Sequence, residues 1–209
     1  MPMPLLSTLA NPWPENSFGA LSNGSSDREL IERIARADRE AMRLLFRRFK
    51  TPVYRFACRL TADATAAEEI VSEVFLDVWR SAAVFEGRSG VSTWLLAITR
   101  NKAMARMRRR PTEALDDAAA ETIQDESDGP EAIFQKQQVR SILLEALTHL
   151  APAHREIIDL VYYHERSIEE VASILKIPKA TVKTRMFYAR QRLAQMLAQT
   201  GQDKALQLH

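Results

Sequence analysis

Apolar residues recur at helical spacing through most of the chain. Between residues 28 and 49 they return every three or four positions, which predicts one amphipathic helix over this stretch. Pro52 should interrupt it, and the apolar positions at 53–60 predict a short second helix before a turn at 61–65. Because no segment requires a strand, the pattern predicts an all-α fold.

Two more helices are expected before residue 111. Thr65 and Glu68 have capping-box spacing and predict the start of a third helix, which ends near Arg80. Its buried face should comprise Ala67, Ile70, Val71, Val74, Phe75 and Val78. The segment 85–92 contains two glycines and is expected to be a loop. A fourth helix should follow it and stop at Pro111.

The overall net charge of +2 conceals three blocks of charge. Residues 27–110 carry a formal net charge of +7, residues 111–135 one of −8, and residues 136–209 one of +4. The acidic block is interpreted as a flexible linker between two basic helical domains that each face a polyanion. The predicted organisation is a flexible tail at 1–26, domains at 27–110 and 136–200, the linker at 111–135, and a tail at 201–209.

Composition disfavours several classes of function. Cys58 is the only cysteine, so no internal disulfide is expected. No apolar run approaches the length of a membrane helix and no signal peptide is evident, so we expect a cytoplasmic protein without membrane insertion. No enzyme activity, metal site or cofactor is expected, because catalytic motifs are missing and His149, His154 and His164 lie singly on or beside helices.

The second domain is expected to contain a helix-turn-helix. Apolar stripes at 139–150 and 157–161 predict two helices ahead of it. Ser167 and Glu170 then have capping-box spacing, and residues 176–178 supply a short turn before a last helix. On that last helix the helical wheel places Val182, Met186, Ala189, Leu193 and Met196 inward, and Ala180, Lys183, Thr184, Phe187, Tyr188 and Gln191 outward.

The outward face of the last helix indicates DNA binding. The second helix of a helix-turn-helix enters the major groove, where lysine, threonine and an aromatic edge can meet base edges and thymine methyl groups. The flanking cations that would hold phosphates are Lys179, Arg185, Arg190 and Arg192. The alternative is a basic helix that is merely solvated, but such a helix rarely presents an outward phenylalanine beside a tyrosine.

The third helix carries a row of like charges. Glu69, Glu73 and Asp77 follow one another at i, i+4 spacing, which is mildly destabilising for the helix. A positively charged partner surface would offset this repulsion. The plain alternative is an acidic face in solvent.

The fourth helix is strongly basic and has aromatic residues beside it. The residues are Arg100, Lys102, Arg106, Arg108, Arg109 and Arg110, with Trp79, Phe85 and Trp94 nearby in sequence. Cations interleaved with aromatic residues and a glycine-containing loop suit binding to unpaired bases, so melted DNA is a plausible ligand. The alternative is that the tryptophans are simply core. The first domain is thus expected to present opposite charges on different faces.

The chain resembles the extracytoplasmic-function (ECF) group of sigma-70 family RNA polymerase sigma factors in residues 27–110 and 138–198. The matching segments are TAAEEIVSEVFLDVWR, FEGRSGVSTWLLAITRN with MRRRP, and LAPAHREIIDLVYY with SIEEVASILKIPKATVKTRMFYARQRL. Their order and spacing, with the unmatched acidic linker, carry the resemblance. It implies a region 2 domain at 27–110 and a region 4 domain at 136–200 that together direct promoter-specific transcription initiation.

The resemblance implies three sets of site residues. Binding of the clamp helices of the polymerase largest subunit falls to Glu69, Ser72, Glu73, Phe75 and Asp77. Capture of the −10 element as it opens falls to Arg88, Ser89, Trp94, Arg100, Asn101, Arg106, Arg108 and Arg109. Recognition of the −35 element falls to Lys179, Thr181, Lys183, Thr184, Arg185, Phe187, Tyr188 and Arg192.

The resemblance also implies partners. These are RNA polymerase core, including the flap of its second-largest subunit, promoter DNA, and an anti-sigma factor that holds the protein inactive in a stress response. In relatives the linker passes through the active-site cleft and RNA exit path, so its acids would mimic nucleic acid. Unchanged initiation after neutralising the acids of 116–128 would reject this role. Ala105 and Tyr188 stand where the family often has Asp and Arg, so promoter sequence should not be copied from relatives.

The rival interpretation is an operator-binding helix-turn-helix transcriptional regulator. Such proteins usually bind duplex DNA as dimers with spaced half-sites, whereas this chain lacks a dimer stripe. The rival also leaves the tryptophans and the glycine-containing loop unexplained. A pure protein-interaction module would leave the recognition helix unexplained.

Overall fold

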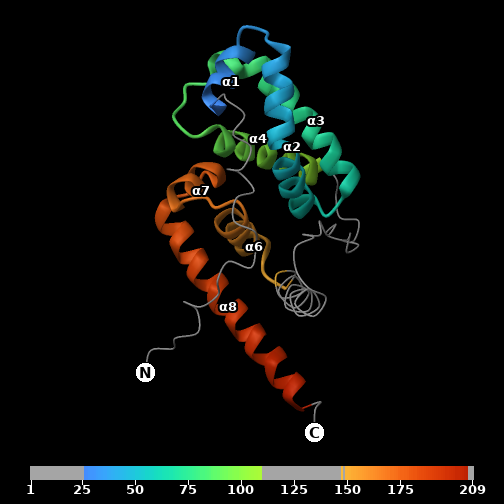
Figure 1. Ribbon diagram of the computed structural model, residues 1–209. Helices are drawn as coiled ribbons and strands as arrows, with labels where there is room; N and C mark the ends of the chain where they lie inside the picture. The colour runs from blue at the N-terminus through green and yellow to red at the C-terminus, as the bar shows by residue number, and fades with distance from the viewer. Residues whose placement is uncertain (1–25, 110–146, 148, 207–209) are drawn as a thin grey trace, which may run out of the picture.

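The computed structural model describes residues 26–109, 147 and 149–206, with side chains as far as Met196. Within these ranges every regular element is a helix and no strand occurs, so the predicted all-α fold is confirmed. The helices form two groups, which we call the first domain (α1 to α4) and the second domain (α6 to α8) (Figure 1). Helix α8 projects away from the rest of the molecule, with the C-terminus at its far end.

The first domain begins with two helices where one was predicted. Its elements are α1 (Asp27–Ile34), α2 (Arg39–Thr61), α3 (Ala64–Ser81), the 3₁₀ turn η1 (Ala82–Val84) and α4 (Val91–Arg109). The chain turns after α1, where Ala37 has a φ of 63°. Asp38 then caps α2 by accepting hydrogen bonds from the backbone N–H groups of Glu40 and Ala41. An aspartate N-cap accepts hydrogen bonds from backbone N–H groups that have no partner within the helix at its start. The apolar spacing at 28–49 continues across this break in the helix and so does not reveal it.

Pro52 does not end a helix, contrary to the prediction. Helix α2 continues through it to Thr61. Phe49 and Val53, on either side of the proline, are both buried in the core of the first domain. Tertiary packing of an apolar face supplies most of the stability of a helix in a protein, and here it outweighs the lost backbone hydrogen bond.

The two predicted capping boxes have different outcomes in the structure. Asp63, rather than Thr65, is the N-cap of α3, and its carboxylate accepts from the backbone N–H of Ala66. In the second domain the predicted capping box is confirmed. The Ser167 hydroxyl accepts from the Glu170 N–H, and the Glu170 carboxylate accepts from the Ser167 N–H.

The second domain contains the predicted helix-turn-helix. Its elements are α6 (Pro152–Ile158), the π-helical turn η2 (Asp159–Tyr163), α7 (Ile168–Leu175) and α8 (Lys179–Leu206). Lys176 ends α7 in the left-handed conformation, and α8 starts three residues later. Helix α8 runs past the predicted domain end at 200. The predicted stripe at 139–150 falls mostly outside the described residues, although Leu150 is buried.

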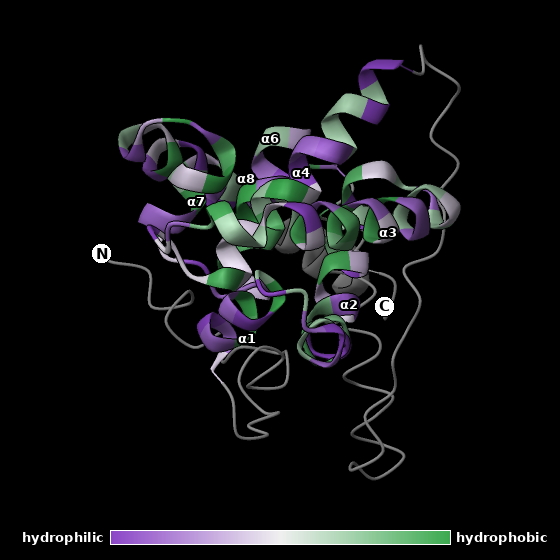
Figure 2. Ribbon diagram, turned by 90° about the horizontal axis from the view of Figure 1, so that it is seen from above, coloured by the Kyte–Doolittle hydropathy of each residue, from purple (hydrophilic) through white to green (hydrophobic). Residues whose placement is uncertain are grey.

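Two hydrophobic cores hold the helices together. The first is built from α1 to α4. The second is built around α6 to α8, yet it also contains Phe56 of α2 and Leu96 of α4. In a view from above, α4 lies in the middle of the molecule with α7 on one side of it and α3 on the other (Figure 2). Helix α4 is therefore shared between the two domains.

The predicted tail at 1–26 and the linker at 111–135 lie outside the described residues, except for Ser26. The Ser26 hydroxyl accepts from the Glu29 N–H and caps α1. Within the described part of the chain, no helix combines the length and apolar character needed to cross a membrane.

Candidate DNA and polymerase interfaces

The outer face of α8 is arranged as the helical wheel predicts. Val182, Met186 and Ala189 are buried, and this contact over about two helical turns fixes the opposite face outward. Phe187 and Tyr188 are 63% and 53% exposed, with ring centroids 5.5 Å apart in an edge-to-face arrangement. Two large aromatic side chains left in water on one helix face are unusual for a merely solvated helix.

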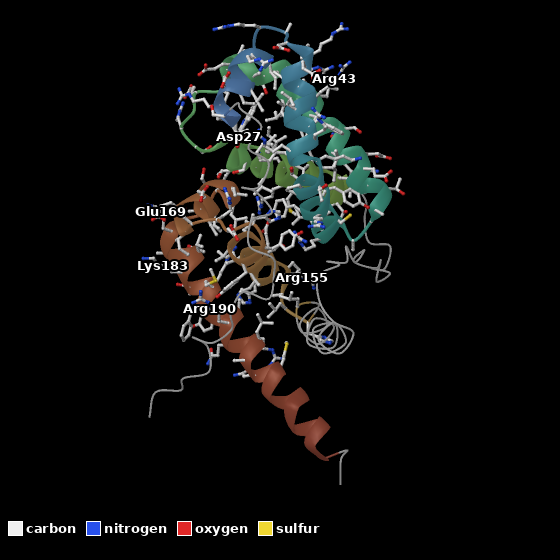
Figure 3. All side chains as sticks on the ribbon, in the orientation of Figure 1. Asp27, Arg43, Arg155, Glu169, Lys183 and Arg190 are labelled. Carbon is white, nitrogen blue, oxygen red and sulfur yellow. The ribbon has the colours of Figure 1, made fainter. Side chains whose placement is uncertain are left out.

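The polar members of the predicted −35 set surround these rings. Lys179, Lys183, Thr184 and Arg192 are exposed, whereas Thr181 and Arg185 are half-buried. Figure 3 shows Lys183 and Arg190 on the outer side of α8, away from the first domain. Lys179 pairs with Glu169 at 3.0 Å, and this hydrogen bond lowers the pKa of the Glu169 carboxyl. Lys179 therefore helps to fix the start of α8 against α7.

A second candidate site lies at the loop before α4. Its lining residues are Asp27, Arg28, Phe85, Gly87, Arg88, Ser89, Gly90 and Val91. Gly87 has a φ of 68°, and the Arg28 guanidinium lies 3.2 Å from the position that a Cβ at Gly87 would take. A left-handed backbone and a close neighbour both favour glycine here. The pocket is thus lined by the predicted loop and by the start of α1.

Asp27 and Arg28 were missed by the sequence analysis. They come from α1, far from the loop in sequence, and only the packing of α1 on η1 brings them close. Asp27 is held in place by an ion pair with Arg48 of α2. Such a tertiary juxtaposition leaves no local signal in the sequence.

Aromatic residues form one wall beside this loop. Phe85 and Trp94 stack in a tilted pair with ring centroids 4.7 Å apart. Both rings are partly buried against the first core, as is Trp79. The tryptophans therefore serve the core, as the plain alternative expected, while Trp94 stays half-buried and stacks on Phe85, which lines the pocket.

The charges of α3 and α4 face each other, so the expectation of opposite charges on different faces is wrong. Lys102 lies 2.8 Å from Asp77 and 3.5 Å from Glu73, and Arg106 pairs with Glu69. Hydrogen bonding to Asp77 raises the pKa of Lys102. The acidic row on α3 thus has its counter-charges within the first domain. Helical periodicity cannot reveal this, because it does not say which faces of two helices meet.

The rest of the predicted −10 set is divided between surface and domain boundary. Asn101, Arg108 and Arg109 are exposed. Arg88 pairs with Glu86 within the loop. Arg100 instead points to the second domain, where its Nε lies 2.6 Å from a carboxylate oxygen of Glu156.

The predicted polymerase-binding set on α3 is partly buried. Glu69, Ser72 and Glu73 are exposed, and Asp77 is half-buried. Phe75 is only 4% exposed and packs edge-to-face on Phe46 with centroids 4.8 Å apart. Its side chain is therefore placed to support this face rather than to offer contact area.

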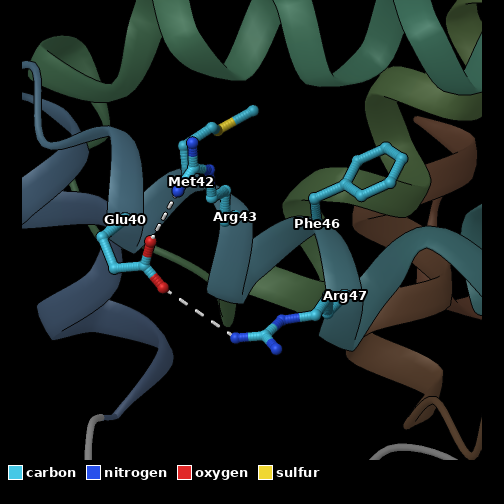
Figure 4. Close-up of a pocket in the computed structure, with 5 residues that line it drawn as sticks. All are labelled: Glu40, Met42, Arg43, Phe46 and Arg47. Atoms are coloured by element: carbon cyan, nitrogen blue, oxygen red, sulfur yellow. Dashed lines mark hydrogen bonds and ion pairs between the residues drawn. The ribbon is translucent and has the colours of Figure 1, made fainter.

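A shallow pocket on α2 continues the α3 surface. It is lined by Glu40, Met42, Arg43, Phe46 and Arg47, and Glu40 bridges the two arginines across it (Figure 4). Leu76 of α3 is also exposed. Since Phe46 packs on Phe75 of α3, apolar side chains of the two helices are in contact beneath this surface. In the sequence these α2 residues belong to a plain amphipathic helix, and no role was predicted for them.

Comparisons with known proteins match both domains. The Sigma-70 region 2 family model matches residues 45–112, and the Sigma-70, region 4 model matches residues 146–195. The RNA polymerase sigma-H factor of Pseudomonas aeruginosa is 27% identical over 190 residues, which cover 87% of this chain and 94% of that protein. The ECF RNA polymerase sigma-E factor of Escherichia coli K12 is 29% identical over 180 residues, which cover 82% and 94%.

Two solved structures share the fold. CnrH in complex with the cytosolic domain of CnrY has a TM-score of 0.60 at 22% identity, covering 83% of this chain and 98% of its own. The sigma factor RpoE of Bartonella quintana, in complex with the anti-sigma factor NepR, has a TM-score of 0.55 at 23% identity, covering 71% and 91%. Both family models and the curated relatives agree with the resemblance seen in the sequence. The chain therefore belongs to the ECF group of the sigma-70 family of RNA polymerase sigma factors.

Proposed function

We propose that this sigma factor reads the −35 element with the outer face of α8 and the −10 element with α4 and the pocket before it. The exposed Phe187 and Tyr188 pair, with Lys183 and Thr184 beside it, carries the first assignment. These side chains lie in the N-terminal half of the second helix of a helix-turn-helix, which is the part that meets base edges in the major groove. We assign the region 2 domain to residues 27–110 and the region 4 domain to residues 136–200.

The −10 assignment rests on the pocket and its surroundings. A left-handed glycine, loop donors and a guanidinium from α1 line a hollow next to a partly exposed Trp94. An unstacked base needs such a hollow together with hydrogen-bond donors, and the strand on either side needs cations. Arg108 and Arg109 at the exposed end of α4 supply cations of this kind.

Polymerase core is the protein partner of a sigma factor, and the surface of α3 is the proposed contact with the clamp helices of the largest subunit. Glu69 and Glu73 remain about half exposed despite their pairing with α4. Exposed ion pairs are individually weak, so a basic partner surface can compete for these carboxylates. The second domain is proposed to meet the flap of the second-largest subunit.

Control by an anti-sigma factor is proposed by analogy. RpoE of Bartonella quintana is seen with the anti-sigma factor NepR, and CnrH with the cytosolic domain of CnrY. We extend such control to this chain, as part of a cytoplasmic stress response. The protein itself is proposed to catalyse no reaction.

Run-off transcription tests the proposed function. Purified polymerase core without a sigma subunit is mixed with this protein and sheared DNA of the source organism, and transcript starts are mapped. Discrete starts that require the protein and share two spaced upstream elements are expected. Inactive core, together with a shift of duplex DNA by the protein alone, would favour an operator-binding regulator instead.

A further inference from the structure

An apolar line, formed by Ala180, Thr184 and Phe187, runs along the outward face of α8. All three residues are exposed, and their i, i+4 and i+7 spacing keeps them on one face of the helix. Because each residue of a helix rises by about 1.5 Å, the line is about 10 Å long. At about 3.4 Å per base pair, it can span about three base pairs.

The hydroxyl of Thr184 is committed to the helix backbone. It donates to the carbonyl oxygen of Ala180 at 3.0 Å, one turn back along the helix. A hydroxyl has one proton to donate, so none is left for an acceptor on a base edge while this bond lasts. The methyl group of Thr184 is therefore the part of the side chain that suits an apolar contact.

The ring of Phe187 is held in place by its neighbour. Tyr188 meets it edge-to-face, with ring centroids 5.5 Å apart, which is a favourable geometry for aromatic pairs. Phe187 nevertheless keeps 63% of its surface exposed. A side chain that is ordered but uncovered loses little conformational entropy when a partner packs on it. Tyr188 thus acts as a positioning residue for the apolar contact that Phe187 offers.

The arginines of α8 lie beside this line rather than on it. The Arg190 guanidinium lies over the ring of Tyr162 on η2, 5.4 Å from its centroid. Arg192 is within 3.5 Å of the Gln195 side-chain oxygen, and Arg185 is half-buried. Bidentate hydrogen bonds from arginine or lysine to O6 and N7 are the commonest way to select guanine. The three residues of the apolar line contain no such donor.

We infer that Ala180, Thr184 and Phe187 select thymine through its C5 methyl group, so that the −35 element contains a short run of A·T pairs whose thymine methyls face α8. This assignment rests on the proposed role of α8 at the −35 element and specifies what that face reads there. The thymine methyl projects into the major groove, and alanine, the threonine methyl and phenylalanine are the apolar groups that suit it.

Deoxyuridine is the DNA probe for this contact, because it pairs with adenine as thymidine does and lacks only the methyl group. Holoenzyme is reconstituted from polymerase core and the full-length chain, and its affinity for a promoter fragment mapped by run-off transcription is measured at fixed salt. Deoxyuridine at one thymine of the −35 run is expected to weaken binding about fourfold, the scale of one buried methyl group. Deoxyuridine between the two promoter elements is the control and should have no effect.

Two nearly isosteric variants of Thr184 assign the contact to a chemical group. Thr184→Ser keeps the hydroxyl and removes the methyl, whereas Thr184→Val keeps the methyl and removes the hydroxyl. On thymine DNA, Thr184→Val is expected to bind about fourfold more tightly than Thr184→Ser. Thr184→Ser should also lose the response to deoxyuridine at one position of the run, and Thr184→Val should keep it. The reverse order of affinities would assign recognition to the hydroxyl and overturn the inference. Circular dichroism verifies that both variants are folded.

A methyl group added to another base separates direct contact from DNA shape. One A·T pair of the run is replaced by a G·C pair, with either cytosine or 5-methylcytosine in the place of thymine. 5-Methylcytosine carries its methyl group at the same ring position, so it is expected to bind about fourfold more tightly than cytosine. If neither deoxyuridine nor 5-methylcytosine changes the affinity, the run is read through its shape and the inference is wrong.

Failure of the proposed function would look different. A holoenzyme that yields no discrete starts, or that binds fragments with and without the upstream element equally, would refute the role of α8 at the −35 element. A mapped −35 element without neighbouring A·T pairs, or specific binding that ignores the methyl groups, would refute the thymine assignment alone.

Discussion

Arg59 on α2 reaches across the domain boundary to Asp159 on η2, with 2.5 Å between its guanidinium Nε and the carboxylate Oδ1. The aspartate side chain is 9% exposed, so little water can replace its partner. Burial raises the pKa of the Asp159 carboxyl, while the Arg59 charge opposes that rise. This pair therefore links the protonation and stability of the second domain to the position of the first.

Arg59→Met is expected to lower the free energy of unfolding by about 2 kcal/mol, because it leaves a buried carboxylate without its counter-charge. Asp159→Asn should cost less, since burial already favours the uncharged form. The double variant should cost less than the sum of the two single variants. Urea titrations of the three variants give the coupling free energy. Additive single effects would mean that the two side chains do not interact.

His164 makes the fold sensitive to acid. Burial is the main cause that holds its pKa well below the ordinary value, and the charges of Arg59, Arg166 and Arg55 act in the same direction. Nε2 lies 3.1 Å from an Arg59 nitrogen and 3.6 Å from the Asp159 carboxylate. Arginine can only donate, so the nearer contact suits a neutral ring whose Nε2 accepts, in the same sense as the lowered pKa.

The sign of the pH dependence follows from that lowered pKa. In the unfolded chain His164 returns toward a pKa of about 6.5, so protonation favours unfolding, and the fold loses stability as the pH falls below that value. The raised pKa of Asp159 acts in the opposite sense. Urea titrations at pH 7.5 and 5.5 should show wild type losing stability at the lower pH, and His164→Gln should lose less. Identical profiles would exclude His164 as the titrating group.

Arg28→Gln is expected to reduce transcription from a melted −10 element by about tenfold, the scale of one lost charge-assisted hydrogen bond. Its guanidinium covers the Gly87 backbone in the pocket but lies off the proposed polymerase contact on α3. Binding to core, measured by fluorescence anisotropy, should therefore be unchanged. Arg36→Gln, after the end of the same helix, serves as the control. A parallel loss of core binding would show that Arg28 supports the fold instead.

Phe187→Ala is expected to weaken binding to a −35 duplex by about 1–2 kcal/mol without changing the melting temperature, because the side chain is 63% exposed. Leu76→Ala removes an apolar side chain that is 46% exposed on α3 and provides the control. Electrophoretic mobility shifts at fixed salt measure both. Equal losses in the two variants would mean that exposed apolar area in general, and not this face of α8, supports binding.

Local signals in the sequence predicted the helix-turn-helix well. The Ser167 and Glu170 capping box and the wheel around Val182 each depend on residues within a few positions of one another, so one sequence suffices to place them. The exposed face of α8 follows directly from that wheel. The break at Asp38 was hidden because apolar spacing continues on both sides of it.

Features that depend on distant contacts were not predictable in this way. The pairing of Lys102 with Asp77, the approach of Arg28 to Gly87 and the contact of Phe56 with the second core all join segments far apart in sequence. The sequence indicated two domains connected by an acidic segment. It contained no sign that α4 would serve both cores, because periodicity identifies an apolar face without identifying what covers it.

The π-helical turn at Asp159–Tyr163 makes segment length a determinant of how the two domains pack. The His164 N–H bonds to the Asp159 carbonyl at 3.0 Å, five residues back, where an α-helix would bond four back. The turn therefore holds one residue more than an α-helical turn would. Each residue of a helix rotates the following side chain by about 100° around the helix axis. Deleting a single residue here would preserve the chemistry of nearly every side chain yet rotate Tyr163 and His164 away from α2. Small insertions and deletions in this turn would therefore change the contact between the two domains while leaving the surface chemistry of each domain intact.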